Sequence, residues 1–199
     1  LRRVVAMHMA AMERTGRRVL HALARGVGIE PECFDDLLGA DPIVLFRIFH
    51  YTAVPDAPWG VGEHTDYGLL TLLWQDDRGG LEVAMPDGTW APVTPRPDAL
   101  VCNLGDMLDR MTGGRLRSTR HRVRPVAPDA PSRISMPFFL DPSWNARVQP
   151  LDLPGPAPTD DADARWDGAS VHDFRGTYGD YLTQKVAKVF PALAEHLQA

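Results

Sequence analysis

Cysteine is scarce in this chain of 199 residues, which contains only Cys33 and Cys102. The two stand far apart and lack the short spacing that is typical of cysteine metal sites. This argues against a disulfide framework of the kind that holds small secreted domains together. We expect both thiols to be free and buried in a reducing compartment, and we therefore predict a cytoplasmic location.

Long apolar runs and an excess of positive charge are also missing. No apolar stretch is long enough to span a membrane, and no secretory signal is visible at the start of the sequence. The net charge is −5, and lysine occurs only at Lys185 and Lys188. These features predict neither a membrane nor a nucleic acid as a partner.

The chain does contain enough apolar residues for one domain with a sizeable core, since 44% of the sequence is hydrophobic. Helical periodicity predicts a leading helix that ends at about Arg25. A short connection follows it, and the two together make up residues 1–42. Residues 43–150 are predicted to form the β-rich core, and residues 151–199 a loop and a final helix. The apolar residues that mark this final helix are Tyr178, Leu182, Val186, Val189 and Phe190.

The core region consists of short β-prone runs separated by turn signals such as Pro86-Asp87-Gly88. Many short strands without intervening helices indicate a sandwich or a closed barrel instead of a sheet built from βαβ units. The fold is therefore predicted to be mainly β with flanking helices. The expected strands are Ile43–Tyr51, Leu69–Gln75, Leu81–Ala84, Trp90–Val93, Ala99–Asn103, Thr119–Val126, Arg133–Leu140 and Arg147–Gln149.

The most informative segment for chemistry contains His64 and Asp66, two positions apart. Alternate side chains of an extended segment point to one face, so the two can converge on one ion. His121, in a later predicted strand, is the best candidate for a third ligand. Two imidazoles and one carboxylate leave three octahedral positions open, which is the arrangement of Fe(II) oxygenases. The alternatives are a turn histidine at His64 and a core histidine at His121.

A second polar pair interrupts a predicted apolar strand. Arg133 and Ser135 are two positions apart, so both side chains are expected to face the interior. A buried guanidinium without a partner would be very costly. The distal carboxylate of a bound ligand would satisfy both groups, with the arginine binding through two N–H groups. The alternative is a salt bridge from Arg133 to a buried aspartate.

Arginine recurs around the third candidate ligand, at Arg120, Arg122 and Arg124. Such a run could belong to a nucleic-acid-binding patch. If His121 and Val123 face the interior, however, strand alternation turns all three arginines outward. We therefore predict an ordinary solvated strand face.

The ordered motifs between about Phe46 and Pro150 resemble the isopenicillin N synthase-like branch of the Fe(II)/2-oxoglutarate-dependent dioxygenase superfamily. In chain order they are Arg47…Tyr51, His64-Thr65-Asp66-Tyr67-Gly68, Leu70-Thr71-Leu72-Leu73, Gln75-Asp76, Gly79-Gly80-Leu81, Gly88-Thr89-Trp90, Asn103-Leu104-Gly105-Asp106, Ser118-Thr119-Arg120-His121-Arg122-Val123 and Arg133-Ile134-Ser135.

The resemblance implies a double-stranded β-helix, that is, a jelly roll of the cupin kind with the metal inside its mouth. By matching position, the Fe(II) ligands would be His64, Asp66 and His121. Arg133 and Ser135 would bind the distal carboxylate of 2-oxoglutarate.

Three further expectations follow from the resemblance. Tyr51 would assist at the cosubstrate, although a core tyrosine with a satisfied hydroxyl is an equal alternative. No catalytic residue is expected beyond the metal centre. The family also has an N-terminal segment that covers part of the barrel. It is absent before Leu1, so we expect a truncated chain or a short variant with a more open site.

The expected function is an oxygenase that uses Fe(II), O₂ and 2-oxoglutarate. It would couple oxidative decarboxylation of 2-oxoglutarate to hydroxylation, desaturation or cyclisation of a small organic substrate, in secondary metabolism. A same-fold iron oxidase that does not use 2-oxoglutarate and a truncated non-catalytic binding module are the alternatives. A zinc hydrolase is disfavoured, because no dedicated general base is recognisable beside the three ligands. The sequence identifies neither the substrate nor the oligomeric state.

Overall fold

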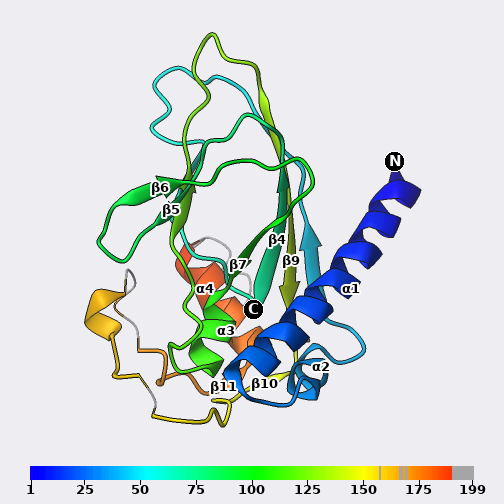
Figure 1. The fold of residues 1–199 in the computed structure, drawn as a ribbon, viewed down its shortest axis with the longest axis vertical. Coiled ribbons are helices and arrows are strands. Elements are labelled where there is room, and N and C mark those ends of the chain that lie inside the picture. The colour runs from blue at the N-terminus through cyan, green and yellow to red at the C-terminus, as the bar shows by residue number, and fades with distance from the viewer. Residues whose placement is uncertain (157, 166–167, 169, 190–199) are drawn as a thin grey trace.

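Two antiparallel sheets form the centre of the computed structural model, which describes residues 1–156, 158–165, 168 and 170–189 (Figure 1). The larger sheet contains, in spatial order, β1 (Ile43–Phe46), β9 (Arg133–Asp141), β4 (Leu70–Gln75) and β7 (Val101–Leu104), and β2 (Phe49–Tyr51) also pairs with β9. The smaller sheet contains β3 (Val61–His64), β8 (His121–Val123), β5 (Leu81–Ala84) and β6 (Trp90–Pro92).

The chain crosses repeatedly between these two sheets. It passes from β3 in the smaller sheet to β4 in the larger one, returns for β5 and β6, crosses to β7, returns for β8, and crosses again to β9. This alternation is the double-sheet arrangement of a jelly roll, which closes a β-core without intervening helices. The predicted fold class, mainly β with flanking helices, is confirmed.

The first helix covers the outer face of the larger sheet. In α1 (Arg2–Val27) the buried residues are Met12, Gly16, Leu20 and Ala24, which recur every four positions and so form one stripe. A Cβ at Gly16 would lie 2.7 Å from Leu140 Cδ2, so the missing side chain lets the helix approach β9 closely. The helix ends at Gly28, whose φ of 80° is left-handed.

The last described helix is attached by both apolar packing and polar contacts, since its Tyr178 and Tyr181 belong to the buried core. In α4 (Tyr178–Val189), the Tyr178 hydroxyl donates to Asp141 Oδ2 at 2.6 Å. Tyr181 and Lys185 both donate to Asp106 Oδ2, at 3.1 and 3.2 Å, and Asp106 begins α3 (Asp106–Met111). Phe190, which the sequence assigned to the final helix, lies outside the described residues.

Several predicted elements have different limits in the structure. The predicted strand Ile43–Tyr51 divides into β1 and β2, and the expected strand over 119–126 is reduced to β8. The predicted connection before residue 43 contains α2 (Glu32–Leu38), whose Phe34 and Leu38 are fully buried.

Some short elements were not predicted at all. They are β3, α3, a turn of 3₁₀ helix at Ala162–Ala164, and β11 (Gly176–Thr177), which pairs with β10 (Arg147–Val148). Each of them is too short to show a clear periodicity in the sequence.

The cysteine prediction is only partly correct. Both thiols are free, but Cys33 is half-buried and Cys102 is exposed, so neither is a core residue. Among the described residues, no helix is both long and apolar enough to cross a bilayer.

Candidate metal centre

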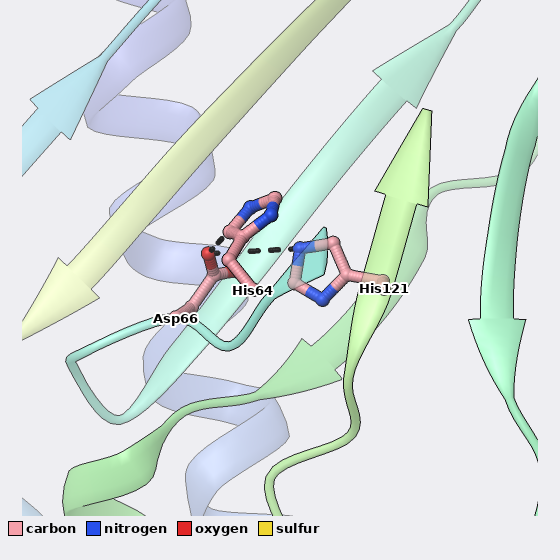
Figure 2. Close-up of side chains that lie close together, drawn as sticks. All are labelled: His64, Asp66 and His121. Carbon is pink, nitrogen blue, oxygen red and sulfur yellow. Dashed lines mark ion pairs between the residues drawn. The ribbon is translucent and has the colours of Figure 1, made fainter. Parts of the chain in front are cut away.

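Three side chains from two neighbouring strands and a turn meet at one point (Figure 2). His64 ends β3, His121 begins β8, and the two residues are paired across the smaller sheet. Asp66 follows two residues after His64, in the connection to β4. Asp66 Oδ1 lies 3.9 Å from His64 Nε2 and 3.7 Å from His121 Nε2. The structure therefore brings together the three residues that the sequence predicted as ligands.

Both imidazoles are held so that Nε2 faces the centre. His64 Nδ1 lies 2.8 Å from the carbonyl oxygen of Gly62, and His121 Nδ1 lies 3.0 Å from that of Thr119. A carbonyl oxygen only accepts hydrogen bonds, so each Nδ1 carries the proton and donates it. In the neutral form of each ring, Nε2 is then the unprotonated nitrogen, which is the atom that binds a metal ion.

The carboxylate of Asp66 is fixed by two polar residues of the larger sheet. Thr71 Oγ1 donates to Asp66 Oδ2 at 2.6 Å, and Asn103 Nδ2 donates to the same oxygen at 2.7 Å. Oδ2 is thereby occupied, and Oδ1 is the oxygen that faces the histidines. Sequence reasoning did not assign roles to Thr71 and Asn103. The available signal was a polar residue within each of two apolar strands.

The turn that carries Asp66 packs so closely against its neighbours that two glycines, Gly68 and Gly105, have no room for a Cβ atom. The Asp66 carbonyl accepts the backbone N–H of Asp106 at 2.7 Å. A Cβ at Gly105 would lie 2.3 Å from the Gly68 carbonyl oxygen, and one at Gly68 would lie 1.6 Å from Asp141 Oδ1. Both glycines are therefore required by close approach, and they set the position of the ligand-bearing turn.

The electrostatic environment favours a neutral His64. Burial lowers the pKa of His64, and the neighbouring His121 imidazole lowers it further, while the Gly62 carbonyl and Asp66 act in the opposite direction. A histidine must lose its charge before it can bind a metal, so the lowered pKa prepares this side chain for coordination.

The donor set fits a divalent transition metal. Two ligands of one ion, at bond lengths of roughly 2.0–2.2 Å, can be at most about 4.4 Å apart. The Oδ1–Nε2 separations of 3.7 and 3.9 Å lie within this limit. They exceed the roughly 3.0 Å that separates two such ligands at 90°, so a facial set requires the side chains to move closer together when the ion binds. Two histidines and one carboxylate on one side of an ion are the facial set that suits non-haem Fe(II) and leaves coordination positions open.

Arg133 and Ser135 lie deeper between the sheets, where they are 3% and 2% exposed. One guanidinium nitrogen of Arg133 donates to Gln75 Oε1 at 3.2 Å, but its Nε and Nη1 are buried without a hydrogen-bond partner. Among the described residues, no aspartate or glutamate pairs with Arg133, so the alternative of a protein salt bridge is wrong there. A buried cation with free donors is the arrangement that binds a carboxylate.

Tyr51 places its aromatic ring beside the buried guanidinium of Arg133. It is paired with Arg133 across β2 and β9, and the guanidinium carbon lies 4.8 Å from the ring centroid. Tyr51 therefore lies beside the group predicted to bind the cosubstrate, in a cation–π arrangement.

The metal centre and the arginine pocket share one interior. Thr71, which contacts Asp66, and Gln75, which contacts Arg133, are four positions apart on β4 and therefore face the same side. Their Cα atoms are about 13 Å apart at the usual rise of a strand.

The arginine prediction for β8 is partly wrong. Arg124 is exposed and the Arg120 side chain is 40% exposed, but the side chain of Arg122 is only 20% exposed. It pairs with Glu82 at 2.8 Å and lies over the rings of Trp59 and Trp90. Strand alternation correctly predicted that Arg122 faces away from His121. The prediction of a solvated face is wrong at Arg122, because tryptophans cover the outer face of the strand at this point.

Comparison with known proteins agrees with this geometry. Residues 42–142 match the family described as the 2OG-Fe(II) oxygenase superfamily. A probable iron/ascorbate oxidoreductase of Dictyostelium discoideum is 38% identical over 213 residues, covering 97% of this chain and 58% of that protein. A 1-aminocyclopropane-1-carboxylate oxidase of Dictyostelium mucoroides is 32% identical, covering 92% and 58%. This chain thus spans a little more than half the length of these relatives.

Similar solved structures lead to the same family. A full-length protein of Neurospora crassa, in complex with alpha-KG (2-oxoglutarate) and thymine, superimposes with a TM-score of 0.78. It is 28% identical in sequence, and the match covers 95% of this chain and 57% of that one.

Proposed function

Because the chain belongs to the 2OG-Fe(II) oxygenase superfamily, we propose that it catalyses Fe(II)- and 2-oxoglutarate-dependent oxidation of a small organic substrate, with hydroxylation as the default outcome. Within the superfamily we place it in the isopenicillin N synthase-like branch, on its His-x-Asp, His and Arg-x-Ser motifs. Residues 1–199 would act as one catalytic domain.

The proposed metal ligands are His64, Asp66 and His121. Bound Fe(II) would supply the activation of O₂ and the oxidation of a C–H bond, chemistry that side chains alone cannot perform. The protein would orient the ion through the Gly62 and Thr119 carbonyls on the two histidines. The proposal assigns no further acid or base to the chain, in keeping with a reaction performed at the metal.

The proposed cosubstrate site is built from Arg133, Ser135 and Tyr51. The observation that carries the proposal is the Arg133 guanidinium, since this residue is 3% exposed and retains two unpartnered nitrogens. A distal carboxylate of 2-oxoglutarate would neutralise this charge, and the Ser135 hydroxyl would donate a further hydrogen bond to that carboxylate. The other end of 2-oxoglutarate would lie toward the metal centre, on the same face of β4.

Two alternatives predict different ligand binding. An iron oxidase that does not use 2-oxoglutarate would bind the metal but would need the Arg133 pocket for a carboxylate of its own substrate. A non-catalytic binding module would need no metal. The small molecules named for similar proteins, such as 1-aminocyclopropane-1-carboxylate and thymine, support a small-molecule substrate here.

The deciding experiment is an anaerobic titration of the Fe(II)-loaded protein with 2-oxoglutarate, followed by admission of O₂. We expect a charge-transfer absorption band that saturates with 2-oxoglutarate, and succinate formation after O₂ is admitted. The His121→Ala variant is the matched control and should show neither. Metal binding without the band would favour the 2-oxoglutarate-independent oxidase, and absence of metal binding would favour the binding module.

A further inference from the structure

A stack of three side chains lies on the outer face of the smaller sheet. The guanidinium carbon of Arg122 is 4.4 Å from the ring centroid of Trp59 and 4.0 Å from that of Trp90. Trp90 begins β6, Arg122 is the central residue of β8, and Trp59 lies in the connection between β2 and β3. The arginine is thus held between two indole rings from different parts of the chain.

The stack is fixed by a largely buried ion pair. Arg122 Nε donates to Glu82 Oε2 at 2.8 Å, and the two side chains are 20% and 12% exposed. Because Arg122 and Glu82 are paired across β8 and β5, the guanidinium plane is set by the sheet itself. A planar guanidinium in a fixed orientation can stack on aromatic rings, which a lysine ammonium cannot do in the same way.

Trp59 belongs to a connection that has few other anchors. Most of residues 52–60 are exposed, including Val54, which is 58% exposed. Where the connection returns to the sheet, the Gly60 N–H donates to the Val123 carbonyl at 2.9 Å. An exposed connection of this length would be mobile unless side chains hold it. The stack supplies such a contact one residue before Gly60.

The two ends of this connection lead to the two halves of the proposed active site. It starts directly after Tyr51, which lies over Arg133 in the proposed cosubstrate pocket. It ends at β3, which carries His64. Gly60 also packs against Tyr51, since a Cβ at this glycine would lie 3.3 Å from Tyr51 Cδ1. In Figure 1 the connection is the cyan segment at the upper end of the sheets, the end at which β9 begins with Arg133.

We propose that Arg122 is a positioning residue for 2-oxoglutarate: its stack with Trp59 holds the 52–60 connection, and the connection in turn supports Tyr51 in its place beside the Arg133 guanidinium. The inference rests on the proposed function for its ligand, but the positioning of the connection can be measured without any ligand. Loss of the stack should loosen the cosubstrate end of the interior and leave the metal end unchanged, because His64 and His121 are held by the backbone carbonyls of Gly62 and Thr119.

The test compares Arg122→Lys, Trp59→Leu and the matched control Arg124→Lys. Lysine at 122 keeps the charge opposite Glu82 and loses the planar stack. Arg124 also approaches Glu82, at 3.5 Å, but it is 57% exposed and is not part of the stack, so its replacement should be silent. Three quantities are measured on each protein: amide hydrogen exchange of residues 52–60 in the ligand-free chain, the dissociation constant of the metal, and that of 2-oxoglutarate under nitrogen.

We expect both test variants to exchange roughly two- to five-fold faster in residues 52–60 and to bind 2-oxoglutarate about two- to five-fold more weakly, the effect of losing a cation–π contact to an exposed ring, because Trp59 is 41% exposed. Metal affinity should match the parent. Unchanged exchange, or equal losses of metal and 2-oxoglutarate affinity, would overturn the inference. If the parent itself fails to bind 2-oxoglutarate, the proposed function fails instead, and the exchange rates still decide whether the stack holds the connection.

Discussion

At the scale of single residues, the centre is built from side chains that leave one atom free for a ligand. Asp66 has one oxygen occupied by Thr71 and Asn103, and each histidine has its Nδ1 occupied by a backbone carbonyl. The remaining atoms, Oδ1 and two Nε2, converge. Such supporting hydrogen bonds orient metal ligands and limit the entropy that is lost when the ion binds.

Replacing Thr71 by valine tests this support. Thr71→Val keeps the shape of the side chain but removes the hydroxyl that donates to Asp66. We expect metal affinity to fall by roughly 10–100-fold, the usual effect of losing a supporting hydrogen bond. Competition with a chromophoric chelator measures it. Thr15→Val is the control, because Thr15 is exposed on α1 and bonds only within its helix. Equal metal affinity in all three proteins would show that the Thr71 hydroxyl is not needed.

Replacing Arg133 separates ligand binding from stability. Arg133→Met removes a buried charge whose Nε and Nη1 have no partner. We expect 2-oxoglutarate binding to weaken by roughly 2–5 kcal/mol, while metal binding is kept. In the absence of ligand the variant should be at least as stable as the parent, because an unpaired buried charge is lost. Anaerobic titration and urea unfolding measure the two effects. Unaltered 2-oxoglutarate affinity would make Arg133 a structural residue.

At the scale of elements, α4 docks against the end of β9 through a buried acid. Asp141 is 9% exposed and accepts the Tyr178 hydroxyl, and Tyr178 is fully buried. Burial raises the pKa of Asp141 to about 7; the hydrogen bond from Tyr178 opposes this rise, and the Asp66 carboxylate adds to it. Burial and the neighbouring Asp141 also raise the pKa of Tyr178, so the hydroxyl remains a donor.

This raised pKa predicts a pH-dependent stability. The folded chain holds the Asp141 proton more tightly than the unfolded chain, so this group stabilises the fold fully below about pH 4. Its contribution is lost as the pH rises through the folded pKa of about 7. In the Asp141→Asn variant the side chain cannot ionise, so this loss of stability with rising pH should disappear. At pH 8 the variant should be more stable than the parent by up to roughly 4 kcal/mol, at about 1.4 kcal/mol for each pH unit between the two pKa values.

Urea unfolding of the metal-free proteins between pH 4 and 8 measures this effect. Tyr178→Phe is the informative control, since it removes the hydrogen bond but keeps the ionisable carboxyl, and its stability should still fall with rising pH. Parallel pH profiles for the parent and Asp141→Asn would show that Asp141 does not titrate in this range.

At the scale of the whole molecule, the candidate centre connects the two sheets. His64 and His121 belong to the smaller sheet, and Asp66 is tied by Thr71 and Asn103 to β4 and β7 of the larger one. An ion bound by all three would therefore resist separation of the sheets. Its binding free energy would add to the free energy of unfolding, because the unfolded chain does not present the three ligands together.

Metal removal should accordingly lower thermal stability. A free metal concentration of about 100 times the dissociation constant adds about 2.7 kcal/mol, which corresponds to roughly 5–10 °C for a chain of this size. Differential scanning fluorimetry with Co²⁺ or with a chelator measures the shift. His121→Ala should melt at the same temperature in both conditions. If the melting temperature of the parent protein is the same with and without Co²⁺, the three residues do not form a metal site that joins the two sheets.

The sequence by itself determined the features that have a local signature. A sandwich or closed barrel followed from strand periodicity and turn residues, and the jelly roll followed from the family resemblance of the ordered motifs. The first helix followed from the helical spacing of its apolar residues, which predicted an end at about Arg25, close to the observed end of α1 at Val27. The candidate ligands were recognisable because two of them are two positions apart in one segment. Arg133 was recognisable because a cation within an apolar strand requires a partner.

Only the tertiary structure decided which distant residues meet. Thr71 and Asn103 are ordinary strand residues until the pairing of β4 with β7 places both beside Asp66. Arg122 was expected in solvent, because alternation states which face a side chain takes but not what covers that face. Trp59, from a distant part of the sequence, covers it. Short elements such as β3 also depend on their neighbours. A segment of a few residues is too short to show the periodicity of a strand, so its conformation is decided by the strands with which it pairs.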